Sequence, residues 1–125
     1  PVIEAVRQVI AWSSSYFRRY HLIGYSFGAC MALSALTIEA LSYSAIAPPL
    51  AEEDFSALPT LSLPVCLITA AQETLLAAPE PFSAQPFLTS IRIEGADHFF
   101  RNREEEMAGR ILAFLAACDA GAADH

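Results

Sequence analysis

The sequence predicts an α/β fold in which a mostly parallel sheet of about four strands is flanked by helices. The elements follow in the order helix, strand, helix, three strands and helix, which is typical of this class. The run 65–69 is almost continuously apolar, as expected of a strand that is covered on both faces. An amphipathic helix over residues 103–117 closes the chain.

The first half of the chain alternates helical and strand patterns. Apolar residues recur at helical spacing over residues 2–16, which predicts a helix with one buried stripe. A short strand is expected over 19–24. Residues 27–39 are rich in Ala, Leu and Met, and we expect a second helix there. The apolar run 43–47 predicts the second strand, because the two prolines that follow it cannot continue a hydrogen-bonded ladder.

The second half is richer in loops. Residues 50–64 are predicted to form a loop, and residues 73–89 contain three prolines and room for one or two helical turns. The run 90–93 is expected to be the fourth strand. Residues 119–125 are expected to be a frayed tail, and residues 1–125 together one partial domain.

Composition excludes several classes of function. The chain has 125 residues, is 54% hydrophobic and carries a formal net charge of −7, without a single lysine, so it is globular and unsuited to nucleic acid. Apolar runs are too short to cross a membrane. The three cysteines are scattered and odd in number, and no metal or cofactor spacing is present, which favours a reducing, cytoplasmic setting without a cofactor.

The segment from Gly24 to Gly28 matches the G-x-S-x-G pattern of a nucleophile elbow. This pattern places a serine on a sharp turn between a strand and a helix, and the predicted elements around Ser26 are a strand and a helix in that order. The alternative is a glycine-flanked turn with an idle serine. The sequence therefore predicts Ser26 as a nucleophile.

A serine hydroxyl becomes nucleophilic when an imidazole accepts its proton and an acid orients that imidazole. His98 follows the fourth predicted strand, at the sheet edge where sites of α/β proteins lie. His21 begins a strand at the wrong end, and His125 is in the tail, so both are expected to be structural or idle. His98 is the predicted base, with a core or surface histidine as the alternative.

The acid is less well defined. The expected order is serine, acid, histidine, and Glu73 occupies the position after the third strand. Asp54, in the loop after the second strand, is the alternative, and a third possibility is that no acid functions. Asp97 is next to His98 in sequence, where an extended loop would point it away.

Four segments, in order, resemble small lidless bacterial serine hydrolases of the α/β-hydrolase superfamily, near the dienelactone-hydrolase type. They are the elbow region 21–29, the run Ile-Ala-Pro-Pro-Leu with Asp-Phe-Ser soon after it, residues 64–74, and Gly-Ala-Asp-His-Phe-Phe at 95–100. The resemblance implies Ser26 as nucleophile, His98 as base and the backbone N–H of Phe27 as one oxyanion donor.

The chain departs from this family at two places. The family has Gly-x-x-Asp after the third strand, where this chain has Ala-Ala-Gln-Glu at 70–73. The family's N-terminal strands and its His-Gly-rich loop, which gives the second oxyanion donor, have no counterpart before Ser26. We therefore expect the C-terminal portion of the fold, with the elbow strand near an open sheet edge that favours a homodimer.

Two functions follow from these residues. The first is hydrolysis of a small carboxylic ester or thioester through an acyl-enzyme, with Tyr25, Phe55 and Phe99 beside Phe27 around an acyl pocket, unless they are ordinary core aromatics. The second is a catalytically degenerate module of the same fold that binds a ligand or partner without turnover. An acyltransferase would need an acceptor site that the sequence does not display.

Overall fold

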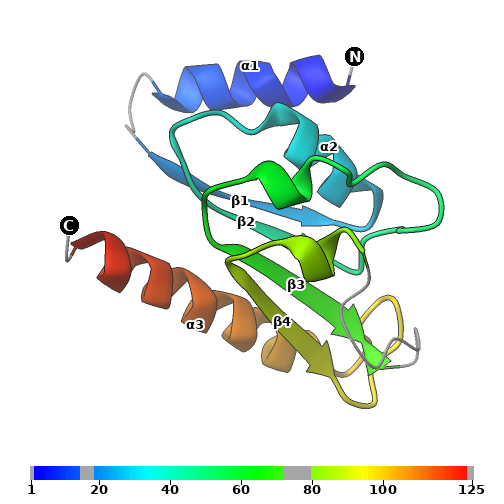
Figure 1. The fold of residues 1–125 in the computed structure, drawn as a ribbon. Coiled ribbons are helices and arrows are strands. Elements are labelled where there is room, and N and C mark those ends of the chain that lie inside the picture. Colours follow the sequence, from blue (N-terminus) through cyan, green and yellow to red (C-terminus); the bar gives the residue numbers. More distant parts are fainter. Residues whose placement is uncertain (1, 15–18, 72–79, 124–125) are drawn as a thin grey trace.

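The computed structural model describes residues 2–14, 19–71 and 80–123 (Figure 1). Short 3₁₀ turns occur at Leu58–Thr60 and Phe82–Ala84. The helices and strands are α1 (Val2–Ser14), β1 (Tyr20–Tyr25), α2 (Phe27–Ala35), β2 (Ala40–Ile46), β3 (Val65–Ala70), β4 (Leu88–Ile93) and α3 (Glu104–Ala123).

The four strands form one parallel sheet in the order β1-β2-β3-β4, which confirms the predicted fold class. The register pairs Tyr25 with Ile46 and Ala70 with Ile93, so the carboxyl ends of the strands meet at one edge. Within the described sheet β1 is an outer strand, as expected for the elbow strand. Loops that follow the strands therefore converge on the end of the sheet where Ser26 lies.

Helices cover both faces of this sheet: α1 and α2 lie on one side and α3 on the other (Figure 1). Alternate residues of β3 face the two layers. Val65 and Leu67 belong to the buried cluster that includes α2, whereas Cys66 and Ile68 belong to the cluster that includes α3. This arrangement explains the continuous apolar run, because a strand between two helical layers has no solvent-facing side.

The second helix is shorter than predicted. It ends at Ala35 because Leu36 has extended backbone angles (φ −59°, ψ 140°), and β2 begins at Ala40. Ile38, inside the predicted helix, is 92% exposed, so no core contact favours continuing the helix. A hydrogen bond of 2.9 Å from the Thr37 N–H to the Tyr20 hydroxyl holds the turn instead.

The last helix is longer than predicted. Helix α3 continues to Ala123, so the expected frayed tail is wrong for residues 119–123. The physical reason is a tertiary contact: Asp119 Oδ1 lies 2.8 Å from His21 Nε2, and Cys118 packs against the cluster beneath α3. None of the described helices combines the length and the apolar character that a membrane crossing requires.

Candidate active site

Ser26 occupies the sharp turn between β1 and α2. Its backbone lies in the left-handed region (φ 53°, ψ −125°), where a residue with a Cβ is strained by about 1–3 kcal/mol. The surrounding structure holds it there: the Ser26 N–H donates to Ile46 O at 2.8 Å, and the Ser26 carbonyl accepts from the Ala29 N–H at 2.9 Å. The turn has the strand-to-helix geometry that the G-x-S-x-G pattern predicts.

The space available for a side chain differs between the two glycines of the turn. A Cβ added to Gly24 would lie 2.5 Å from the Ala29 Cα and 2.6 Å from the Gly28 oxygen, so α2 can approach β1 only because this position lacks a side chain. A Cβ added to Gly28 would have nothing within 4 Å. Space around the turn therefore requires glycine at Gly24, but at Gly28 it does not.

The structure brings Ser26 and His98 together. Ser26 Oγ and His98 Nε2 are 3.2 Å apart, within hydrogen-bonding distance, although 72 residues separate them in sequence. The two residues follow the outer strands β1 and β4, three strand spacings or about 14 Å apart. The loop after β4 must therefore cross the ends of β3 and β2 to deliver the imidazole.

Two contacts shape the loop that carries His98. The Tyr25 hydroxyl donates to the His98 carbonyl oxygen at 2.8 Å, and the two rings lie with centroids 5.7 Å apart. Asp97 Oδ1 accepts hydrogen bonds from the backbone N–H groups of Phe99 (3.0 Å) and Arg101 (3.3 Å). The Asp97 carboxylate thus stabilises its own turn.

The acid of the site is not assigned by these contacts. Glu73, the predicted acid, falls within 72–79, outside the described residues. The alternative, Asp54, accepts a hydrogen bond at 2.8 Å from the Ser56 N–H, and hydrogen bonding by Ser56 holds the pKa of Asp54 below its usual range. The Asp54 carboxylate therefore has a structural task within its own loop.

Aromatic residues are next to Ser26 and His98 in the chain, and the rings of Tyr25 and Phe99 lie close to the His98 ring. Tyr25, Phe27 and Phe99 are 42%, 50% and 60% exposed, and the Phe99 ring meets the His98 ring edge-on at 5.2 Å. Phe55 is different, because it is 2% exposed and packs against Phe82 with ring centroids 5.6 Å apart. These contacts are those of an ordinary core aromatic, which was the alternative to a place in the acyl pocket.

Phe27 is also the first residue of α2. Backbone N–H groups in the first turn of a helix lack intrahelical acceptors, and the helix dipole adds positive potential there. The Phe27 N–H belongs to this first turn and directly follows Ser26 in the chain.

Other nucleophiles and metal ligands are poorly placed. Burial raises the pKa of the Cys66 thiol to about 12 and raises that of Cys30 as well, so both thiols stay protonated near neutral pH. Within residues 2–14, 19–71 and 80–123, no group of three or more His, Cys, Asp or Glu side chains could hold a metal ion.

Sequence reasoning missed one contact at this site, and elsewhere it left open whether His21 is structural or idle. Tyr25 is predicted to lie beside the acyl group, and its hydroxyl in addition holds the backbone of His98, a contact across 73 residues that no local pattern signals. His21 was expected to be structural or idle. It bridges Ser42 Oγ (2.6 Å from Nδ1) and Asp119 Oδ1, which ties β1 and β2 to α3.

Solved structures share this fold. One is a protein of unknown function from Agrobacterium tumefaciens, ATU1826, proposed to be an α/β hydrolase; it matches with a TM-score of 0.81 and 24% identity over 95% of this chain and 61% of that protein. Another is an α/β serine hydrolase homologue from Coxiella burnetii, with a TM-score of 0.64 and 22% identity over 84% of this chain and 54% of that one. No family model and no curated protein matches the sequence.

The chain therefore has part of an α/β-hydrolase fold, and it spans about three fifths or less of the length of these two structures. At these identities the likeness concerns the fold. What the site does has to be argued from its own residues.

Proposed function

We propose that this chain, with its portion of the α/β-hydrolase fold, forms the catalytic part of a serine hydrolase that cleaves a carboxylic ester or thioester. The observation that carries the proposal is the 3.2 Å contact between Ser26 Oγ and His98 Nε2, made by a serine on a left-handed turn. A strained backbone persists when the surroundings enforce it, and such strain is concentrated at functional sites. An idle serine would gain nothing from this conformation.

In the proposed mechanism Ser26 Oγ attacks the substrate carbonyl carbon while His98 Nε2 accepts the serine proton. The carbonyl π electrons move to the oxygen, which becomes an oxyanion. Collapse of this tetrahedral intermediate breaks the bond to the alcohol or thiol, and the imidazolium of His98 returns the proton to that leaving group. Water then hydrolyses the acyl-serine by the same steps, with His98 again as base.

Three further roles belong to the proposal. The Phe27 N–H donates a hydrogen bond to the oxyanion, a contribution that in other enzymes is worth about 100- to 1000-fold in rate per donor. Glu73 orients His98, with Asp54 as the alternative acid. Phe99 and Phe27, both exposed beside the site, contact the apolar part of the acyl group.

A fluorophosphonate probe tests the nucleophile directly, because its phosphorus forms a bond to an activated serine oxygen and loses fluoride. Labelling is expected in the wild-type chain and should be lost in Ser26→Ala and in His98→Gln. Ser34→Ala is the matched control, since Ser34 is an exposed serine on α2 and should leave labelling unchanged. Folding of each variant is checked by circular dichroism.

Absence of labelling in a folded wild-type chain would contradict the proposal and favour a degenerate module of the same fold. Labelling that survives Ser26→Ala would place the reactive group elsewhere. If labelling behaves as expected, p-nitrophenyl esters and acyl thioesters of increasing chain length would then separate ester from thioester preference.

A further inference from the structure

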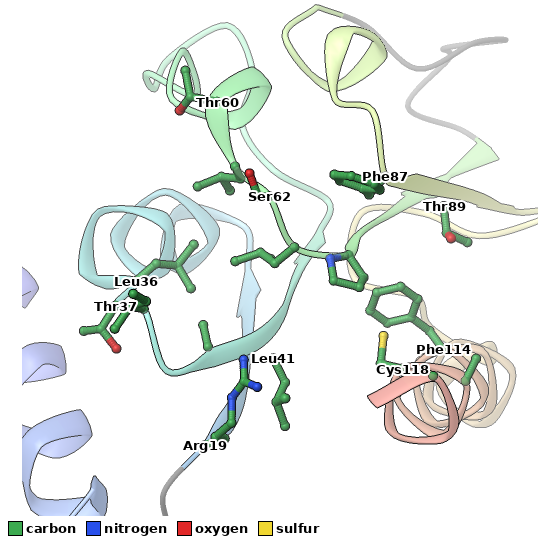
Figure 2. Close-up of a pocket in the computed structure, with 17 residues that line it drawn as sticks. Arg19, Leu36, Thr37, Leu41, Thr60, Ser62, Phe87, Thr89, Phe114 and Cys118 are labelled. Carbon is green, nitrogen blue, oxygen red and sulfur yellow. The ribbon is translucent and has the colours of Figure 1, made fainter. Parts of the chain in front are cut away.

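A cavity of about 960 Å³ lies far from Ser26, at the amino ends of the strands (Figure 2). Its wall includes Ala40 and Leu41 at the start of β2, Pro64 just before β3, and Thr89 near the start of β4. The C-terminal half of α3 closes another side. Because β1 is six residues long, the cavity and the Ser26–His98 pair are about 20 Å apart. A molecule in this cavity cannot react at Ser26.

The cavity is predominantly apolar. Its volume lies within the range of about 300–1,000 Å³ that small-molecule sites occupy in proteins. Hydroxyl groups, among them those of Thr37 and Ser62, add polar points to the wall. The large apolar side chains that line it are Leu36, Ile38, Leu41, Leu61, Leu63, Phe87 and Phe114.

Among the described residues that line this cavity, Arg19 alone carries a charge. Figure 2 shows its guanidinium reaching toward the cavity beside Leu41. Arg19 Nε donates to the Glu39 carbonyl oxygen at 3.5 Å, a long bond that leaves the terminal nitrogens of the fork for another acceptor. Although the chain has a net charge of −7, the guanidinium of Arg19 gives this cavity a local positive charge that can attract an anion.

Glu39, whose backbone carbonyl accepts the bond from Arg19, has its carboxylate engaged elsewhere. Its Oε2 accepts a hydrogen bond from the Thr37 hydroxyl at 2.6 Å. That hydrogen bond is the main reason why the pKa of Glu39 lies below its usual range, and the charge of Arg19 contributes least. Arg19 and Glu39 are therefore only weakly coupled.

The Cys118 thiol also lines the cavity, and its reactivity can report whether a ligand is bound there. Figure 2 shows its sulfur pointing toward the cavity beside Phe114. The thiol is partly exposed, and burial raises its pKa, so it reacts slowly with alkylating reagents at neutral pH and faster as the pH rises.

We propose that this cavity binds an amphipathic carboxylate, with its carboxylate on Arg19 and its alkyl chain along the leucine and phenylalanine walls. A guanidinium matches a carboxylate through two parallel hydrogen bonds. The single cation suits one negative charge, whereas a phosphate-rich ligand would need several cations. The site is separate from the proposed catalytic site, and its occupancy does not depend on Ser26.

Octanoate is the test ligand, added to the ¹⁵N-labelled full chain and followed by NMR. Saturable shifts are expected at Arg19, Leu41 and Cys118, and none at Gly24 or Ser26. Arg19→Gln should weaken octanoate binding about tenfold, because a charged hydrogen bond is lost, without weakening the binding of octanol. Glu39→Gln is the matched neighbour and should leave affinity nearly unchanged, because the Glu39 carboxylate is bound by Thr37 and is only weakly coupled to Arg19.

Alkylation of Cys118 gives an independent measurement. Iodoacetamide at pH 8.5 should modify Cys118 more slowly in the presence of octanoate, and this protection should be lost in Arg19→Gln. Ser26→Ala should keep full protection, which separates the proposal from the proposed hydrolase activity.

Three results would overturn the proposal: no saturable shift in the folded chain, shifts confined to residues around Ser26, or equal loss of octanoate and octanol binding in Arg19→Gln. The last would show that the arginine supports the fold of the wall and does not bind the carboxylate.

Discussion

At the scale of single residues, the turn around Ser26 depends on one close approach and one strained backbone. Gly24 lets the start of α2 lie against β1, and Ser26 is then forced to a positive φ. The glycine pattern in the sequence locates this turn correctly. The pattern does not show that packing requires glycine at Gly24 but not at Gly28, because this depends on which atoms a Cβ at each position would meet.

Alanine substitutions at the two glycines should therefore have opposite effects on stability. Gly24→Ala is expected to lower the free energy of unfolding by at least about 2 kcal/mol, because backbone atoms that cannot move aside occupy the space. Gly28→Ala should leave it unchanged or raise it by up to about 1 kcal/mol, since alanine favours helix. Urea denaturation of both variants measures the difference. Equal losses would contradict the assignment.

Tyr25 is predicted to position His98, the proposed base. Tyr25→Phe keeps the ring against His98 but removes the hydroxyl that holds the His98 carbonyl, so we expect fluorophosphonate labelling or ester turnover to slow about tenfold at an unchanged KM. Tyr20→Phe is the control, because it removes a hydroxyl from the same strand at the opposite end, where it contacts Thr37. A similar rate loss in both variants would indicate a general effect on folding.

At the scale of elements, the ends of helices are decided by contacts from other parts of the chain. The predicted end of the last helix was too early because nothing near Asp119 in sequence indicates that β1 delivers His21 to it. The predicted second helix was too long for the converse reason: residues 36–39 have helical composition, but Tyr20 binds their turn. Local propensity is weak beside such contacts.

The His21–Asp119 pair should therefore control the last turns of α3. Asp119→Asn is expected to increase amide hydrogen exchange near the end of α3 while lowering the free energy of unfolding by less than about 1 kcal/mol, because Asp119 is 62% exposed. Glu105→Gln, in the exposed first turn of the same helix, should leave exchange there unchanged. Unaltered exchange in Asp119→Asn would show that packing alone holds this end.

At the scale of the whole molecule, the sheet separates two regions. Its carboxyl edge gathers Ser26 and His98, and its amino edge opens into the cavity with Arg19 and Cys118. The outer position of β1 leaves the elbow strand at a sheet edge within the described structure, and a homodimer through that edge stays a prediction. The core between these edges buries Tyr43 and Cys66, and burial raises the pKa of both, which favours their neutral forms.

This core predicts a loss of stability in alkali. Burial raises the pKa of Cys66 from its ordinary value of 9.0 to about 12, so the unfolded chain releases this proton at lower pH than the folded chain. The stabilising contribution is full below pH 9 and is lost as the pH rises through about 12. Urea denaturation from pH 8 to 11 should therefore show falling stability, with a smaller fall in Cys66→Val. Parallel pH dependences would contradict this role for Cys66.

The sequence by itself determined the fold class, the elbow turn and the segment that carries His98. These features rest on local patterns: apolar runs covered on both faces, glycines at a turn, and the order of the elements along the chain. Tertiary structure decided what depends on residues far apart in sequence. It decided the contact of Ser26 with His98, the attachment of Tyr25 to the His98 loop, the burial of Phe55, and the cavity around Arg19. The physical reason is that distances across the sheet follow from strand order and register, which no local pattern encodes.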